Sequence, residues 1–210
     1  MTSEDASTVR QSFRDAAGAF VEVVAVMGEE DWAKPGLGVW TVRDLAGHTS
    51  RALVTVESYL DPGTTAHDPA LADAVAYFRA AASGLADAEA IAERGRQAGR
   101  ALGDDPHATV AALAERVLAL VDASPDDALV TSPMGTITLV GYLPTRVFEL
   151  AVHTLDLVSA TGAAVPAALA GPVRAGLHLA ADLADVNGST AGVQLALTGR
   201  RPLPEGFSVL

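Results

Sequence analysis

Apolar residues recur every three or four positions along almost the whole chain, which is the spacing of a helix that buries one face. This spacing predicts helices over residues 7–27, 41–60, 69–102, 106–123, 144–161 and 166–186. The third helix is predicted to break near Ser83 and Gly84. Thr41 and Asp44 stand three residues apart at the start of the second helix, as in a capping box with Asp in place of Glu.

Two segments depart from the helical spacing. Residues 124–143 mix β-branched residues with Pro133 and Gly135, and they are expected to form a loop or a short irregular hairpin. The apolar run 193–197 is compatible with one strand. The expected fold class is therefore an all-α bundle with long connections and a short C-terminal tail.

Composition excludes several classes of protein. Half of the 210 residues are hydrophobic and 5% are aromatic, so the core must consist mainly of Ala, Val and Leu, and wholesale disorder is excluded. A net charge of −12 argues against nucleic-acid binding. The absence of cysteine excludes a disulfide scaffold, a thiolate nucleophile from the chain, an iron–sulfur cluster and a Cys-type zinc finger.

The sequence contains no segment typical of a signal peptide or a membrane span. Residues 1–14 are polar, and the longest uncharged runs, 128–145 and 157–173, both contain Pro and Gly. A cytoplasmic protein without membrane partners is expected. The ratio of 13 Arg to one Lys, with abundant Ala and Gly, indicates a GC-rich bacterial genome.

Glu149 and His153 are the first candidates for chemistry. They are four residues apart, so they share one face of the predicted helix, and apolar residues fill the positions between them. A buried carboxylate is costly unless it is paired or bound to a cation, and a carboxylate with a neutral imidazole suits a divalent metal such as zinc. An exposed Glu–His pair is the alternative interpretation.

His48 extends this pair to three ligands. It lies within the second predicted helix, and Gly47 beside it would allow another helix or a metal centre to approach closely. A His₂Glu set leaves one coordination position open, which is typical of a catalytic rather than a structural metal. Spacing alone does not bring the two helices together, and a non-haem iron oxygenase site would use the same donor types.

Two stretches resemble one family. Residues 38–48, Gly-Val-Trp-Thr-Val-Arg-Asp-Leu-Ala-Gly-His, and residues 143–157, Leu-Pro-Thr-Arg-Val-Phe-Glu-Leu-Ala-Val-His-Thr-Leu-Asp-Leu, resemble the mycothiol-dependent maleylpyruvate isomerase N-terminal family. That family belongs to the DinB-like metal-binding four-helix bundles. The resemblance extends over about residues 5–187 and implies a DinB-like bundle at 1–187, followed by a short tail at 188–210.

The resemblance also implies a metal site and a reaction. The metal ligands of the family fall on His48, Glu149 and His153, and they imply zinc or another divalent metal with a low-molecular-weight thiol, mycothiol, as cosubstrate. In the isomerase the thiol adds to a double bond, rotation follows, and the thiol leaves. Use of mycothiol also implies an actinobacterial source.

Four neighbouring residues are further candidates. Asp156 shares the face of Glu149 and His153 and is placed to hydrogen-bond a ligand His, or else to cap the helix end. Arg51 and Arg146 each lie three residues from a ligand and are candidates to bind a substrate anion, with a structural ion pair as the alternative. The resemblance adds Arg79 as a candidate anion-binding residue.

The other histidines are assigned ordinary roles. His67 and His107 are expected to be solvated, and His178 is expected to be a hydrogen-bonded core residue.

The leading functional hypothesis is a metal-dependent, thiol-linked transferase or isomerase that acts on a small electrophile. The isomerase has a sizeable C-terminal domain that helps bind substrate, whereas only residues 188–210 follow the bundle here. The alternative is therefore a non-enzymatic helical bundle that binds a metal or small ligand, as a monomer or a homodimer.

Overall fold

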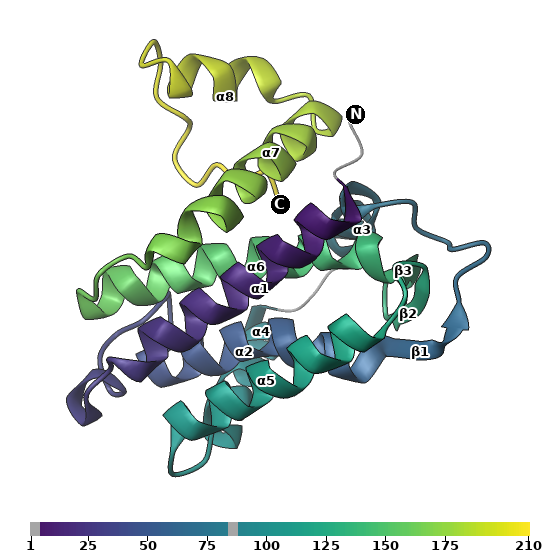
Figure 1. Ribbon diagram of the computed structural model, residues 1–210. Coiled ribbons are helices and arrows are strands. Elements are labelled where there is room, and N and C mark those ends of the chain that lie inside the picture. The colour runs from purple at the N-terminus through teal and green to yellow at the C-terminus, as the bar shows by residue number, and fades with distance from the viewer. Residues whose placement is uncertain (1–4, 84–87) are drawn as a thin grey trace.

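Four long helices pack side by side as a bundle in the computed structural model, which describes residues 5–83 and 88–210 (Figure 1). They are α1 (Ala6–Ala25), α2 (Val42–Tyr59), α5 (Pro106–Ala123) and α6 (Leu139–Thr161). α1 and α2 each contact both α5 and α6, so the four helices enclose one core. The all-α bundle predicted from the helical spacing is confirmed, as is the DinB-like fold that the family resemblance implied.

The core of the bundle is filled by aliphatic residues with a few aromatic rings. Fully buried side chains come from all four helices: Phe13, Phe20, Leu45, Leu53, Val110, Val117, Leu143 and Leu150. Each buried Leu or Phe contributes about 1.5–3 kcal/mol relative to an exposed position. The packing of these apolar faces, rather than the helix propensity of each segment, therefore holds the bundle together.

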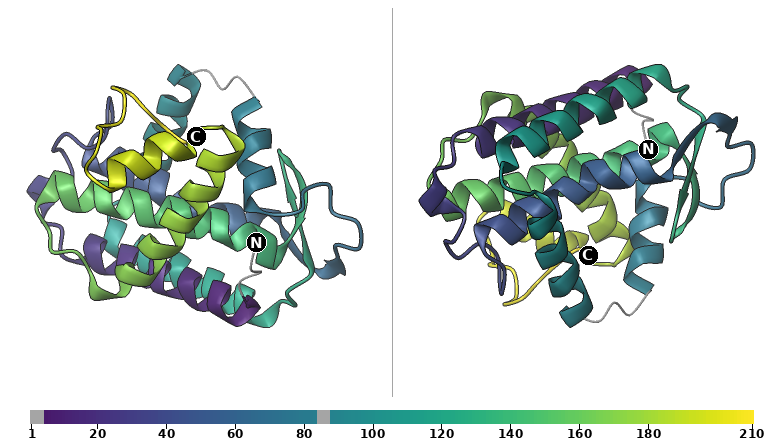
Figure 2. Two further views of the ribbon diagram at one scale, coloured as in Figure 1. Left: turned by 90° about the horizontal axis from the view of Figure 1, so that it is seen from above. Right: turned by 90° about the horizontal axis from the view of Figure 1, so that it is seen from below.

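Shorter helices cover the bundle on its outer sides (Figure 2). α4 (Ala88–Ala101) packs on α2, while α7 (Ala170–Val186) packs on α6 and α1, and α3 (Ala74–Ser83) contacts α6 and α7. The predicted helix 69–102 thus begins later than expected and ends at Ser83 before α4 starts, and Gly84 lies outside the described residues. Asp73 explains the late start, because its Oδ1 accepts a hydrogen bond from the Ala76 amide at 2.9 Å, as an N-cap does.

The start of α2 has the predicted capping box. The Asp44 amide donates to Thr41 Oγ1 at 3.2 Å, and the Thr41 amide donates to Asp44 Oδ2 at 3.1 Å. One turn later the backbones of α2 and α4 meet at Gly47 and Gly99. A Cβ atom added at Gly47 would lie 2.1 Å from Gly99 N, so no side chain fits at this crossing.

A three-stranded antiparallel sheet lies at one end of the bundle. Its strands are β1 (Leu60–Thr65), β2 (Ala128–Ser132) and β3 (Gly135–Thr138), in the order β1-β2-β3. β2 and β3 form the hairpin expected within residues 124–143. Gly135 begins β3 with a φ of +134°, a backbone conformation that side-chain-bearing residues rarely adopt.

Two boundaries predicted from proline and apolar runs are wrong. α6 begins at Leu139 rather than at Pro144, because Thr138 Oγ1 accepts from the Gly141 amide at 3.1 Å and starts the helix earlier. Residues 193–197 are not a strand but the second half of the helix α8 (Thr190–Leu197). A segment of five residues, Val-Gln-Leu-Ala-Leu, has too few periods to distinguish a strand from a helix.

Residues after α8 fold back toward α7. The Asn187 side chain donates to the Val209 carbonyl at 2.9 Å, and Val209 packs against the cluster of Phe78, Phe148 and Leu183. Among the described helices, none is long and apolar enough to cross a membrane.

Candidate metal centre

His48 on α2 meets Glu149 and His153 on α6. One ligand atom from each residue lies within 4.8 Å of the other two, and His153 Nε2 lies 3.4 Å from Glu149 Oε2. The shared helix face explains the contact between Glu149 and His153, and the packing of α2 on α6 adds His48. All three side chains are half-buried, so the cluster is set into the protein without being closed off from its surface.

His153 is held from both sides of its ring. Its Nδ1 lies 3.0 Å from Asp156 Oδ2, one turn further along α6, and its Nε2 faces Glu149. Burial alone would lower the pKa of His153, but hydrogen bonds to the two carboxylates outweigh it and raise the pKa to about 9. A carboxylate that contacts Nδ1 fixes the orientation of the ring. It leaves Nε2 as the ring nitrogen that faces Glu149 and can ligate a metal.

The environment of His48 favours the neutral imidazole. Burial, and then the positive charge of His153, lowers the pKa of His48 to about 4. Its ring lies 4.5 Å from that of Trp40, measured between centroids, and its buried Nδ1 has no hydrogen-bond partner among the residues that the structure describes. Trp40 is itself fixed, because its Nε1 donates to the Ala92 carbonyl of α4 at 2.9 Å.

Glu149 is ionised despite its setting. Burial would raise the pKa of Glu149, but its hydrogen bond with His153 and the charge of Arg146 hold the pKa below its ordinary value. The three groups therefore offer one carboxylate and two imidazoles in a small volume. This donor set fits a divalent cation with nitrogen and oxygen ligands.

Arg146 is buried and does not face open solvent. Its side chain is 8% exposed, its guanidinium lies 4.9 Å from the Tyr142 ring centroid and 5.4 Å from that of Tyr77, and its Nε donates to Thr145 Oγ1 at 2.9 Å. Across the described chain, no carboxylate forms an ion pair with it. Arg146 is therefore placed to act on Glu149 through its charge.

Arg51 lies beside a pocket of about 730 Å³ between α2, α4 and α5. Arg94 on α4 lines the same pocket, and both arginines are close enough to His48 for their charges to lower its pKa. Half of the residues that line the pocket are Ala, Leu or Val, and the lining also includes Glu57 and Arg116, which form an ion pair with each other at 3.1 Å. An anion in this pocket would thus meet two guanidinium groups at the side nearest to the three clustered residues.

The remaining candidates lie apart from the cluster. Arg79 is exposed on α3, and no hydrogen bond or ion pair joins it to another described residue. His67 is exposed, as expected. The expectations for the other two histidines are wrong: His107 is half-buried against the Trp32 ring, 5.6 Å away between centroids, and His178, on α7, is exposed and lines a pocket rather than the core.

A family model, the mycothiol maleylpyruvate isomerase N-terminal domain, matches residues 13–158. This match covers more than half of the chain and includes all three clustered residues. The chain belongs to this family. Searches of curated proteins and of solved structures give no significant match.

Two neighbours of the cluster in this isomerase-family chain were not assigned a role by the sequence. Trp40 is part of the stretch 38–48 and was given no role there, but its ring lies against that of His48. Arg94 was not singled out, because the run 93–96, Glu-Arg-Gly-Arg, has the appearance of an ordinary solvated helix surface. The one available signal was the pair Gly95 and Gly99, which marks the side of α4 that approaches Trp40 and α2.

Proposed function

We propose that His48, Glu149 and His153 bind one divalent metal ion, with Zn²⁺ as the native metal. The observation that carries the proposal is the convergence of the three side chains from two helices. Two ligands about 2.1 Å from a tetrahedral zinc ion lie about 3.4 Å apart. The distance between His153 Nε2 and Glu149 Oε2 is 3.4 Å. The unpartnered state of buried His48 Nδ1 also favours a site that is completed by a ligand.

We further propose that the site serves a thiol-linked reaction on a small electrophile, with mycothiol as the thiol. Membership of the isomerase family associates the chain with mycothiol chemistry. The chain has no cysteine, so the thiol must be supplied from outside. A bound zinc ion would lower the pKa of such a thiol, so that thiolate forms near neutral pH.

The residues around the cluster have different roles: some position the metal ligands, and others bind the substrate. Asp156 orients His153, and Arg146 keeps Glu149 ionised by its charge. Arg51 and Arg94 are the residues placed to hold an anionic group of the electrophile, because they line an open pocket while Arg146 is enclosed by tyrosine rings. Capture of the substrate is therefore assigned to Arg51 with Arg94 rather than to Arg146.

Calorimetric titration of the zinc-loaded protein with mycothiol tests this function. In two buffers of different ionisation enthalpy near pH 7, we expect saturable heat and the release of about one proton per site. Glu149→Gln should abolish both, because an amide is a poorer metal ligand than a carboxylate. Glu115→Gln on the exposed surface of α5 is the matched control and should change neither.

The thiol titration, combined with a kinetic assay of maleylpyruvate isomerisation, tests the assignment of the arginines. Arg51→Ala should leave the heat of thiol binding unchanged but raise the KM for maleylpyruvate, whereas Arg174→Ala on the exposed face of α7 should leave both unchanged. Absence of heat and of proton release at millimolar thiol would contradict the thiol-linked enzyme. A metal-binding bundle without thiol chemistry would then be the better account.

A further inference from the structure

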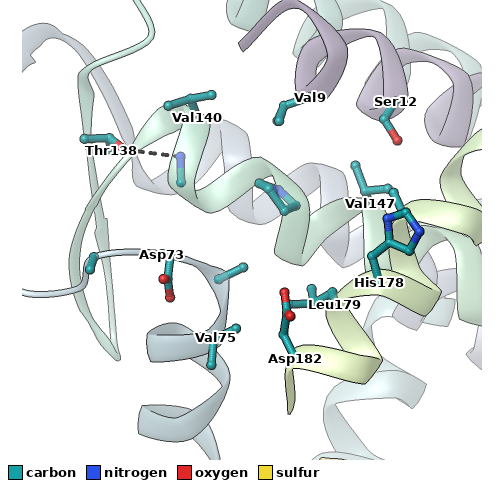
Figure 3. A pocket seen from close by; sticks show the side chains of 15 residues that line it. Val9, Ser12, Asp73, Val75, Thr138, Val140, Val147, His178, Leu179 and Asp182 are labelled. Carbon is teal, nitrogen blue, oxygen red and sulfur yellow. Dashed lines mark hydrogen bonds between the residues drawn. The ribbon is translucent and has the colours of Figure 1, made fainter. Parts of the chain in front are cut away.

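A second pocket, of about 580 Å³, lies between α1, α3, α6 and α7 (Figure 3). Its volume is in the range of small-molecule sites in proteins. Most of its wall is aliphatic, and the residues that form this wall are Val9, Ala72, Ala74, Val75, Val140, Pro144, Val147, Ala175 and Leu179. The pocket can therefore bury a compact apolar body.

This pocket is separate from the metal centre because the two use opposite faces of α6. Val140 and Pro144 line the pocket, whereas Glu149 and His153 belong to the metal centre. Glu149 follows Val140, and His153 follows Pro144, by nine positions. Nine residues at about 100° each amount to two and a half turns, so the residues of each pair lie on opposite sides of α6. A ligand in the pocket would therefore not contact the metal centre.

Among the described residues, the titratable groups that line the pocket are the carboxylates of Asp73 and Asp182 and the imidazole of His178. Asp73, beside α3, and Asp182, on α7, lie on opposite sides of the pocket (Figure 3), and no Lys or Arg is among the described residues that line it. One oxygen of Asp73 caps α3 through the Ala76 amide, which leaves the other available. The Asp182 carboxylate makes no hydrogen bond or ion pair with any other described residue.

The hydroxyl of Ser12, on α1, is a further polar group at the pocket, and this buried Oγ has no hydrogen-bond partner among the described residues. Rotation of this hydroxyl toward a ligand would therefore break no existing hydrogen bond. Buried polar groups in native proteins are almost always paired, so an unpaired hydroxyl at a cavity favours a ligand that completes it.

We propose that this pocket binds a small organic cation, an ammonium group on an aliphatic body. The aliphatic wall would take the body, and Asp73 and Asp182 would hold the ammonium group between them. The charge complementarity selects this class, because an anion would meet two carboxylates and no Lys or Arg, and a neutral alcohol would not compensate the charge of the carboxylates.

Titrations with three probes of equal length test the proposal: n-hexylammonium, hexan-1-ol and hexanoate. Methyl chemical shifts of Val75, Val147 and Leu179 report occupancy of the pocket. We expect saturable binding of hexylammonium with a Kd on the order of 1 mM, weaker binding of hexanol and none of hexanoate. Equal affinity for hexylammonium and hexanol would overturn the proposal, as would hexylammonium shifts that do not saturate below about 20 mM.

Two variants test whether the carboxylates of Asp182 and Asp73 bind the ammonium group. Asp182→Asn should weaken hexylammonium binding about fivefold, the upper range for a partly exposed ion pair, and leave hexanol binding unchanged. Asp73→Asn keeps an oxygen that can cap α3 and should weaken binding similarly. Glu115→Gln removes the same charge from a distant surface and should have no effect; an equal loss in this variant would show that only the net charge of −12 matters. His153→Ala should also have no effect, so failure of this proposal and failure of the metal site are distinguishable.

Discussion

Gly47→Ala is predicted to destabilise the protein, because Gly47 is the point where α2 crosses α4. The added Cβ would lie 2.1 Å from Gly99 N and 2.4 Å from the Ala98 carbonyl carbon. Ordinary contact begins near 3.4 Å, so α4 must move by about 1.3 Å relative to α2. Both neighbours are backbone atoms, which cannot rotate out of the way.

The expected magnitude follows from two opposing effects. Replacing Gly by Ala within a helix contributes up to about 1 kcal/mol of stability, whereas overpacking a close contact costs typically about 1–3 kcal/mol and sometimes more. We expect a net loss of about 1–2 kcal/mol in the free energy of unfolding. Displacement of α4 would also move Trp40 away from His48, because Trp40 Nε1 is hydrogen-bonded to Ala92 of α4.

Urea denaturation followed by circular dichroism at 222 nm measures this effect. Gly18→Ala is the matched control, since Gly18 is exposed within α1 and no atom lies within 4 Å of its added Cβ. The control should stabilise the protein by about 0.5–1 kcal/mol. If Gly47→Ala were as stable as Gly18→Ala, the close approach of α2 and α4 would be wrong.

Three further predictions concern particular side chains. Asp156→Asn should weaken zinc binding about 10–100-fold in a chelator competition, because it disturbs the orientation of His153, while exposed Asp127→Asn should not. Thr41→Ala should lower the free energy of unfolding by about 0.5–2 kcal/mol in urea, because Asp44 loses its capping partner, and an unchanged urea midpoint would contradict the capping box. In metal-free protein, the pKa of about 9 for His153 lies above its unfolded value of about 6.5, so its contribution to stability is complete below pH 6.5 and is lost as the pH rises through 9. If the urea midpoint does not decrease as the pH is raised from 6.5 to 9.5, the environment described for His153 is wrong.

The helices were predictable because the apolar spacing that defines them also defines the core. Phe13 and Phe20 follow that spacing and are fully buried in α1. The helix start predicted at Pro144 was wrong, because the capping hydroxyl of Thr138, six residues earlier, determines where α6 begins. The prediction of a strand at 193–197 was wrong because five residues contain little periodicity, and the sequence of one segment does not identify the strands with which it would pair.

The candidate site was predictable to different degrees. Glu149 and His153 could be paired from their spacing on one helix. His48 could be proposed as a third ligand from its chemistry, but spacing alone did not show that its helix meets theirs. From the sequence, Arg51 and Arg146 were equally good candidates for binding an anion. Only the packing distinguishes them, since Arg51 lines a pocket whereas Arg146 is enclosed by Tyr77 and Tyr142. Such a difference depends on neighbours from distant segments, which sequence spacing does not specify.

The most direct test of the central claim is the zinc content of the tag-free protein. After exposure to Zn²⁺ and removal of unbound metal, elemental analysis should find about one zinc per chain. His48→Ala should reduce this content severely, whereas His67→Ala in an exposed loop should retain it. Absence of zinc from the wild-type protein, or equal zinc in the His48→Ala and His67→Ala variants, would contradict a metal centre formed by His48, Glu149 and His153.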